Sequence, residues 1–236
     1  MFKGESTKRS QKLTYILGNL FLNIFLYLIV LVLILYSWTG SLYPEGSGYR
    51  LDFLGDNFIP FIPEMAIFYV YLFFSMLILT LFYFTFIEEE KGYGLGWSIV
   101  IMNVIATMIY IIFPVSTYWW RQELLANRIE GNFFADTMYF YYENETSFNC
   151  LPSMHAGMST ICFFTWYQYY KLKTDPKRKM IAIVVFIIAI GVILSTLFVK
   201  QHYIIDEVAG IALAYLIGRV VFRRSNGWKK NFTDEN

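Results

Sequence analysis

The sequence contains only two histidines, and the first lies among residues suited to phosphate chemistry. His155 belongs to the segment Asn149-Cys-Leu-Pro-Ser-Met-His-Ala-Gly, in which Pro152 suits the first turn of a helix. The free N–H groups and positive dipole end of a helix attract anions, and Ser153 adds a hydroxyl at the same place. The pattern therefore predicts an anion-binding helix start beside His155.

The second histidine, His202, is followed by Asp206 at a spacing of about one helical turn. At that spacing the carboxylate can accept a hydrogen bond from one ring nitrogen and leave the other nitrogen basic. A histidine oriented in this way can act as a nucleophile or as a base. We therefore expect His202 and Asp206 to work as a pair.

Two cations complete the set of candidate residues. Arg121 follows the aromatic pair Trp119-Trp120, and Lys200 lies two residues before His202. Cations and helix-end amides suit a phosphate, whose transfer depends mainly on positioning and on neutralising its oxygens. One histidine can attack phosphorus while the other protonates the leaving oxygen. The tryptophans beside Arg121 also fit an arginine that anchors a helix end at the lipid headgroups.

The elements that must position these residues are six apolar runs, each long enough to cross a membrane. They span about residues 13–38, 64–87, 93–113, 153–170, 180–199 and 203–222. The composition agrees, because 57% of the residues are hydrophobic and only 16% are charged, against roughly a quarter in soluble domains. We expect an all-α, six-transmembrane-helix bundle that forms one domain over residues 1–236, with its catalytic core at 113–210.

The distribution of positive charge predicts the orientation of this bundle. Lys and Arg gather before the first run and after the second, fourth and sixth runs, and short cytoplasmic loops are enriched in these residues. We therefore expect a multi-pass plasma-membrane protein with both termini in the cytoplasm and an active site on the outer face. The segment 51–63 is expected to lie along the outer interface. The residues assigned to the outer face are Arg121, Ser153, His155, Lys200, His202 and Asp206.

Two segments resemble motifs of a known family. Pro152-Ser-Met-His155 resembles the central Pro-Ser-x-His motif of the type 2 phosphatidic acid phosphatase superfamily, and residues 195–206 resemble its Ser-Arg-x5-His-x3-Asp motif with identical spacing. The resemblance covers about residues 113–210. It implies that His202 is a nucleophile that forms a phosphohistidine, that Asp206 orients it, and that His155 is the acid for the leaving group. It also implies a lipid phosphate substrate, phosphate binding by Arg121 and Ser153, and no metal or other cofactor.

The sequence departs from the family pattern at three positions. Thr196 replaces the arginine of the third motif, while Pro114 and Gln122 replace the lysine and proline of the first motif, Lys-x6-Arg-Pro. Lys200 is the candidate for the lost charge because it is close to His202 in the sequence. Phosphotransferases of the inositol-phosphoceramide synthase type are similar in lacking that arginine. Hydrolysis of a lipid phosphomonoester or pyrophosphate, and transfer of a phospho-headgroup to an alcohol, therefore both remain open.

Other classes of function fit the sequence less well. A metal held by His202 and Asp206 would need a third ligand from Glu123, Glu207 or Cys150, none of which has a recognisable spacing. A channel or transporter would place polar residues through the spans, whereas residues 181–193 are almost devoid of them. The net charge of +1 gives no basic field for nucleic-acid binding. The cysteines, Cys150 and Cys162, are too few for a disulfide framework and are expected to be buried.

Overall fold

The computed structural model describes residues 35–87, 89–172 and 175–233. The predicted run at 13–38 lies mostly outside these residues, although 35–40 are helical. Apart from one isolated bridge between Tyr49 and Val115, the regular structure in the described ranges is helical, so the all-α class is confirmed there. The elements are α2 (Leu54–Phe58), η1 (Pro63–Met65), η2 (Ile67–Leu72), α3 (Phe73–Phe86), α4 (Glu89–Ile112), α5 (Tyr118–Ala126), α6 (Phe133–Asn144), α7 (Met154–Leu172), α8 (Pro176–Phe198) and α9 (Ile204–Thr233).

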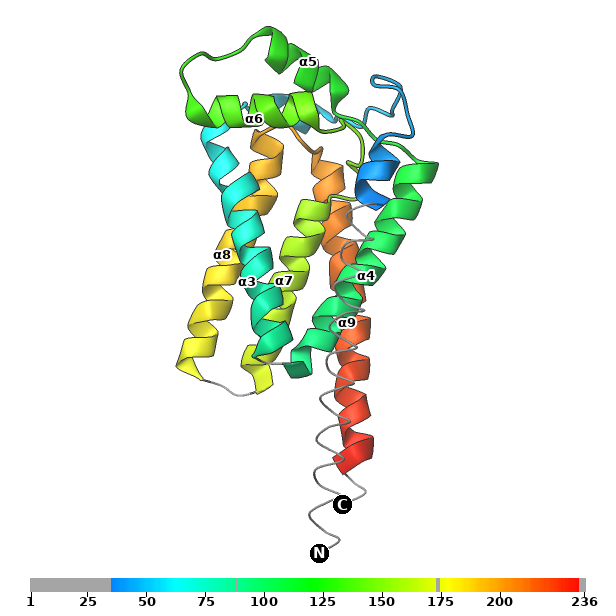
Figure 1. Ribbon diagram of the computed structural model, residues 1–236, viewed down its shortest axis with the longest axis vertical. Coiled ribbons are helices and arrows are strands. Elements are labelled where there is room, and N and C mark those ends of the chain that lie inside the picture. Colours follow the sequence, from blue (N-terminus) through cyan, green and yellow to red (C-terminus); the bar gives the residue numbers. More distant parts are fainter. Residues whose placement is uncertain (1–34, 88, 173–174, 234–236) are drawn as a thin grey trace, which may run out of the picture.

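Five long helices form a bundle, and two shorter helices lie across one of its ends. Helices α3, α4, α7, α8 and α9 run along the long axis of the molecule, while α5 and α6 cross the end at which α7 and α9 begin (Figure 1). We call this end the capped end. Helix α7 is central, because it contacts α3, α4, α8 and α9. A side chain at the start of α7 can therefore meet side chains from several other elements.

Helix boundaries at the capped end follow from local chemistry. Asn132 caps α6, because its side-chain oxygen accepts hydrogen bonds from the N–H groups of the second and third residues after it. Helix α8 ends at Phe198, and Lys200, two residues later, adopts a left-handed conformation with φ of 54°. The N–H of Lys200 bonds to the carbonyl of Leu197 and that of Gln201 to the carbonyl of Thr196, the pattern of a Schellman motif. This turn directs the chain from α8 towards His202.

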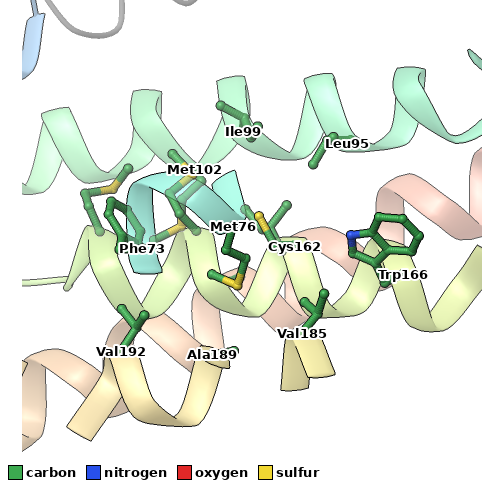
Figure 2. Close-up of a cluster of buried hydrophobic side chains, with 14 of the residues drawn as sticks. Phe73, Met76, Leu95, Ile99, Met102, Cys162, Trp166, Val185, Ala189 and Val192 are labelled. Carbon is green, nitrogen blue, oxygen red and sulfur yellow. The ribbon is translucent and has the colours of Figure 1, made fainter. Parts of the chain in front are cut away.

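The core of the bundle is built from apolar side chains around α7. Figure 2 shows Met102 and Ile99 of α4, Phe73 and Met76 of α3, and Val192 of α8 gathered around this helix. Within a membrane, helices associate through close packing and internal hydrogen bonds rather than through water exclusion. One such bond runs to α3 from Trp166, whose Nε1 donates to the Thr80 hydroxyl at 3.1 Å.

Among the residues that the structure describes, three helical segments are long and apolar enough to cross a membrane: Pro63–Phe86, Gly94–Ile112 and Pro176–Phe198. Their outward faces expose large apolar side chains, for example Leu79 at 66% and Ile187 at 60%, which suits contact with lipid. Helices α7 and α9 lie where two further spans were predicted, but they are not among the segments that are long and apolar enough to cross a membrane. Helix α7 can carry buried polar residues such as Ser159 because neighbouring helices surround it. The chain is a membrane protein, while six spans and their orientation stay predictions.

Candidate active site

The two histidines meet at the capped end of the bundle. His155 lies in the first turn of α7, and His202 lies in the short connection between α8 and α9. The centres of their rings are 5.8 Å apart, and the ring planes are inclined by 64°. The fold thus brings together the two residues that the sequence singled out, as it must for both to reach one substrate atom.

Asp206 faces His202 from the first turn of α9. Asp206 Oδ2 lies 3.5 Å from His202 Nδ1 and accepts a hydrogen bond of 2.9 Å from the N–H of Tyr203, while Oδ1 is buried without a partner among the described residues. Burial alone lowers the pKa of His202, but the carboxyl groups of Asp206 and Glu207 outweigh it, so that this pKa lies above its usual value. The two residues face each other, but His202 Nδ1 has no hydrogen-bond partner among the described residues, so the predicted hydrogen bond to Asp206 stays a prediction.

Ser153 joins the starts of α7 and α9. Its backbone N–H donates to the carbonyl of Asp206 at 3.0 Å, and its hydroxyl accepts from the N–H of Ala156 at 3.2 Å. The close approach needs Gly210, because a Cβ at that position would lie 2.4 Å from the Ser153 carbonyl oxygen. The predicted phosphate-binding serine is therefore held beside the histidine pair by backbone contacts.

Aromatic rings surround His155. The ring of Tyr69 stacks on it at 4.4 Å between centres, and Phe73 lies at 4.5 Å. Tyr69 comes from η2, a π-helical segment, and irregular turns of this kind recur at functional sites. His155 Nδ1 is buried without a hydrogen-bond partner in the described part of the chain. These rings hold the imidazole of His155 in place. They offer no hydrogen bond to Nδ1, so this atom is available to a substrate or to another group that carries a proton.

Arg121 reaches the site from α5, which crosses the capped end (Figure 1). It is 4% exposed, so it is not an arginine that anchors a helix at the membrane surface. Nη1 donates to the carbonyl of Glu145 at 2.8 Å, Nη2 donates to Gln201 Oε1 at 2.6 Å, and the guanidinium lies 5.7 Å from the ring centre of Tyr142. Nε has no partner among the described residues. Since Gln201 adjoins His202, these hydrogen bonds connect Arg121 to the segment that carries His202.

Lys200 is engaged by the loops of the capped end. Its Nζ donates to the carbonyl of Asp56 at 2.9 Å and lies 4.6 Å from the ring centre of Trp120. Burial lowers the pKa of Lys200, while Asp56 and Glu123 act in the opposite direction. Lys200 also lines a cavity of about 320 Å³, together with Asn57, Ile59, Phe61, Trp120, Glu123 and Leu124. Its role as a phosphate ligand stays a prediction; the observed contacts brace the turn before His202.

Comparison with known families accounts for this arrangement. A family model described as the PAP2 superfamily matches residues 60–220, which is more than half of the chain. The chain belongs to the PAP2 superfamily. This is the type 2 phosphatidic acid phosphatase superfamily named above, whose members are usually phosphatases. Comparison with curated proteins and with solved structures gives no match.

Thr196 occupies the position of the arginine in the PAP2 motif, and its side chain contacts the carboxyl group of Glu207. The Thr196 hydroxyl oxygen lies 2.8 Å from Glu207 Oε1 and 2.7 Å from the Ile193 carbonyl oxygen, and its single proton is shared between these two acceptors. Glu207 is 3% exposed and follows Asp206 directly. From the sequence, Glu207 is a candidate only for a metal ligand, because no neighbouring residue indicates that its side chain points into the bundle. The available signal was its place beside Asp206 at the start of an apolar helix.

Cys150, one of the three candidates for a third metal ligand, lies beside His202 and Asp206. Donor atoms of Cys150, His202 and Asp206 all lie within 4.8 Å of one another, which makes them the group of described residues able to hold a metal ion. Burial raises the pKa of the Cys150 thiol, and its Sγ contacts the Ser147 carbonyl at 3.3 Å. Because metals bind the thiolate, a raised pKa weakens Cys150 as a ligand. Cys150 and Cys162 are both free and buried, as predicted.

Proposed function

We propose that this protein is a membrane-integral lipid phosphatase in which His202 attacks the phosphorus of a lipid phosphate. The observation that carries the proposal is the pair of rings 5.8 Å apart, with Asp206 facing one of them. A phosphate between the two histidines would have a nucleophile on one side and a proton donor on the other. Arg121 and the N–H groups at the start of α7 would neutralise its oxygens.

The reaction would proceed in two balanced steps. Neutral His202, with Nδ1 held by Asp206, attacks phosphorus through Nε2; a P–N bond forms and the P–O bond to the leaving group breaks. Protonated His155 gives its proton to the leaving oxygen. Water then attacks the phosphohistidine while neutral His155 takes its proton, and the P–N bond breaks to release phosphate. Both histidines return to their starting forms, so no redox or metal chemistry is needed.

The substrate we propose is a lipid phosphomonoester or pyrophosphate. The site lies at the end of a bundle whose apolar helices suit the bilayer, and this supports a position of the site near the lipid headgroups. We propose the extracytoplasmic face of the plasma membrane for this end of the molecule, because the Lys and Arg residues favour the opposite side. A lipid could then present its phosphate while its chains stay among other lipids.

Transfer to an alcohol is the second candidate. Thr196 stands where the motif has arginine, and this departure is similar to lipid phosphotransferases of the inositol-phosphoceramide synthase type. In such a reaction an alcohol, instead of water, would attack the phosphohistidine. A non-enzymatic channel or transporter has less support, since the histidines, Asp206 and Arg121 converge on one end of the bundle.

The test is a turnover screen of the purified chain over phosphatidate, phosphatidylglycerophosphate and polyprenyl pyrophosphate, with and without acceptor alcohols. Labelled substrate, quenched during turnover, should leave acid-labile phosphate on wild-type protein and none on His202→Ala. The variant should retain its thermal unfolding curve and lose activity by at least about 10³-fold, since a covalent route has no substitute. Retention of a tenth or more of the activity would exclude His202 as the nucleophile.

A further inference from the structure

The carboxyl group of Glu207 is enclosed in the site without a permanent cation as a partner. One oxygen, Oε1, accepts the bond from Thr196, and the side chain of Ser153 also interacts with the carboxyl group. The other oxygen, Oε2, is buried and has no hydrogen-bond partner in the described ranges. The charged groups that act on Glu207 are His202 and Asp206. A buried polar oxygen without a partner is unfavourable unless a ligand satisfies it.

The position at which the chain departs from the family motif therefore lies next to this buried acid. The motif arginine is absent at position 196, and the residue now there holds a carboxylate beside Ser153 and His202. The absence of the motif cation and the presence of the Glu207 carboxyl group both make the site less favourable for negative charge. In a site shielded from water, repulsion between a carboxylate and a phosphate grows with the charge on the phosphate.

We propose that Glu207 is a specificity-determining residue, which makes the site accept a phosphate ester with one negative charge, such as a lipid phosphodiester, in preference to a doubly charged phosphomonoester. The inference rests on the two-histidine mechanism of the proposed function, and it favours the second candidate, transfer of a phospho-headgroup to an alcohol, over hydrolysis of a phosphomonoester. With a diester, the P–O bond to one alcohol breaks as the bond to His202 forms, and His155 supplies the proton to that alcohol. An acceptor hydroxyl then replaces His202 at phosphorus and returns the proton to His155.

The competing explanation is structural. Through its bond with Thr196, Glu207 also fastens the first turn of α9 to the last turns of α8. A merely structural carboxyl group would affect folding, but it would not change the relative affinity for singly and doubly charged phosphates. The ratio of two affinities is therefore the decisive measurement.

The experiment compares binding of inorganic phosphate and dimethyl phosphate to the purified full-length chain at about pH 8, where inorganic phosphate is mostly doubly charged. Wild type should favour dimethyl phosphate. Glu207→Gln keeps the size of the side chain and should improve inorganic phosphate binding by about tenfold or more relative to dimethyl phosphate. Glu130→Gln, which removes an exposed carboxylate between α5 and α6, is the matched control and should leave the ratio unchanged.

A second variant covers the case in which Glu207→Gln does not fold. The double variant Thr196→Val/Glu207→Leu removes both hydrogen-bonding partners together, which is often nearly neutral for a buried pair. It should shift the ratio in the same direction. An unchanged ratio in a folded variant, a wild-type preference for inorganic phosphate, or no binding of either ion would each overturn the proposal.

The same proteins separate this inference from the proposed function. Turnover of phosphatidate and phosphatidylglycerol in mixed micelles is measured beside the binding assay. A shifted affinity ratio without His202-dependent turnover would overturn the catalytic proposal and leave the charge preference standing. Turnover that depends on His202, with a ratio unaffected by Glu207→Gln, would overturn the charge preference alone.

Discussion

The backbone N–H of Ser153 donates a hydrogen bond of 3.0 Å to the backbone carbonyl of Asp206. This bond connects the first turns of α7 and α9, and so it fixes the predicted phosphate-binding serine relative to the residue that faces His202. Backbone atoms make the connection, so neither side chain is used up by it. The position of Ser153 relative to Asp206 therefore depends on how closely α9 approaches α7.

Gly210→Ala should disrupt that approach. The new Cβ would lie 2.4 Å from the Ser153 carbonyl oxygen, which is backbone and cannot swing aside. We expect at least about a tenfold loss of kcat/KM and a destabilisation of about 1–3 kcal/mol, as overpacking usually causes. Gly218→Ala on the same helix is the control, because its Cβ would meet the side-chain ring of Phe164 at 3.1 Å. Equal losses in both variants would contradict a special role for this contact.

Asp206→Asn should change the pH dependence as well as the rate. The reactive form of His202 is neutral and its pKa lies above the usual value, so activity should fall as the pH drops through that raised pKa. Removing the carboxylate removes one cause of the increase, so the acid limb of kcat/KM should move to lower pH. The maximal rate should fall by about 10²-fold or more. Asp136→Asn in α6 is the control; an unmoved acid limb in Asp206→Asn would contradict this account.

Arg121→Lys should weaken substrate binding despite the conserved charge. A lysine cannot reproduce the planar fork that bonds Glu145 and Gln201 at once. We expect kcat/KM to fall by about 10-fold to 100-fold, chiefly through KM. Arg128→Lys is the matched control, since Arg128 pairs with Glu143 at an exposed position. Steady-state kinetics of both variants would decide, and similar losses would count against Arg121 as a phosphate ligand.

Activity should survive excess EDTA. In the proposed mechanism Arg121 and the N–H groups at the start of α7 meet the charge on phosphate, so no divalent ion is required. The informative arm is Cys150→Ser, because Cys150 lies with His202 and Asp206 in the group able to hold a metal. Loss of activity on chelation, with recovery on adding a divalent ion, would favour a metal mechanism instead.

A labelling experiment tests the predicted orientation. In a background lacking the two native cysteines, Glu130→Cys should react with an impermeant maleimide in intact cells, whereas Thr174→Cys should react only after lysis. The expectation follows from the enrichment of Lys and Arg on the side that includes 171–179. The opposite pattern would place the capped end in the cytoplasm. Labelling of both positions in sealed cells would mean a wrong number of spans or a dual topology.

Much of the bundle could be predicted because hydrophobic length is a local property. The runs at 64–87, 93–113, 153–170, 180–199 and 203–222 each correspond to a helical segment of the structure. Helices α5 and α6 were not predicted, because they are short and lie in a connection whose apolar residues show no long run. Asn132 was the readable signal, since this residue type caps helices and here it does.

The sequence predicted only those residues of the site that belong to short motifs. The fold brings His155 and His202 together and sets Asp206 opposite His202, while the roles of these residues stay predictions. The partners of Arg121 could not be read from the sequence, because Gln201 is distant along the chain and an ordinary glutamine carries no signal of its own. The inward orientation of the Glu207 side chain could not be read from the sequence either, because it depends on the packing of α8 against α9.

The π-helical segment before α3 has a consequence for how the chain tolerates change in length. From Ile67 to Leu72 the backbone holds more residues per turn than an α-helix, and the N–H of Phe73 reaches back to the carbonyl of Phe68. Deleting one residue there would restore regular winding and rotate everything that follows by about 100°. Phe73 and Met76 would then turn from α7 towards lipid, while Tyr69 could still reach His155. Deletion of a single residue between Ile67 and Leu72 would thus change which side chains α3 presents to α7 along its whole length.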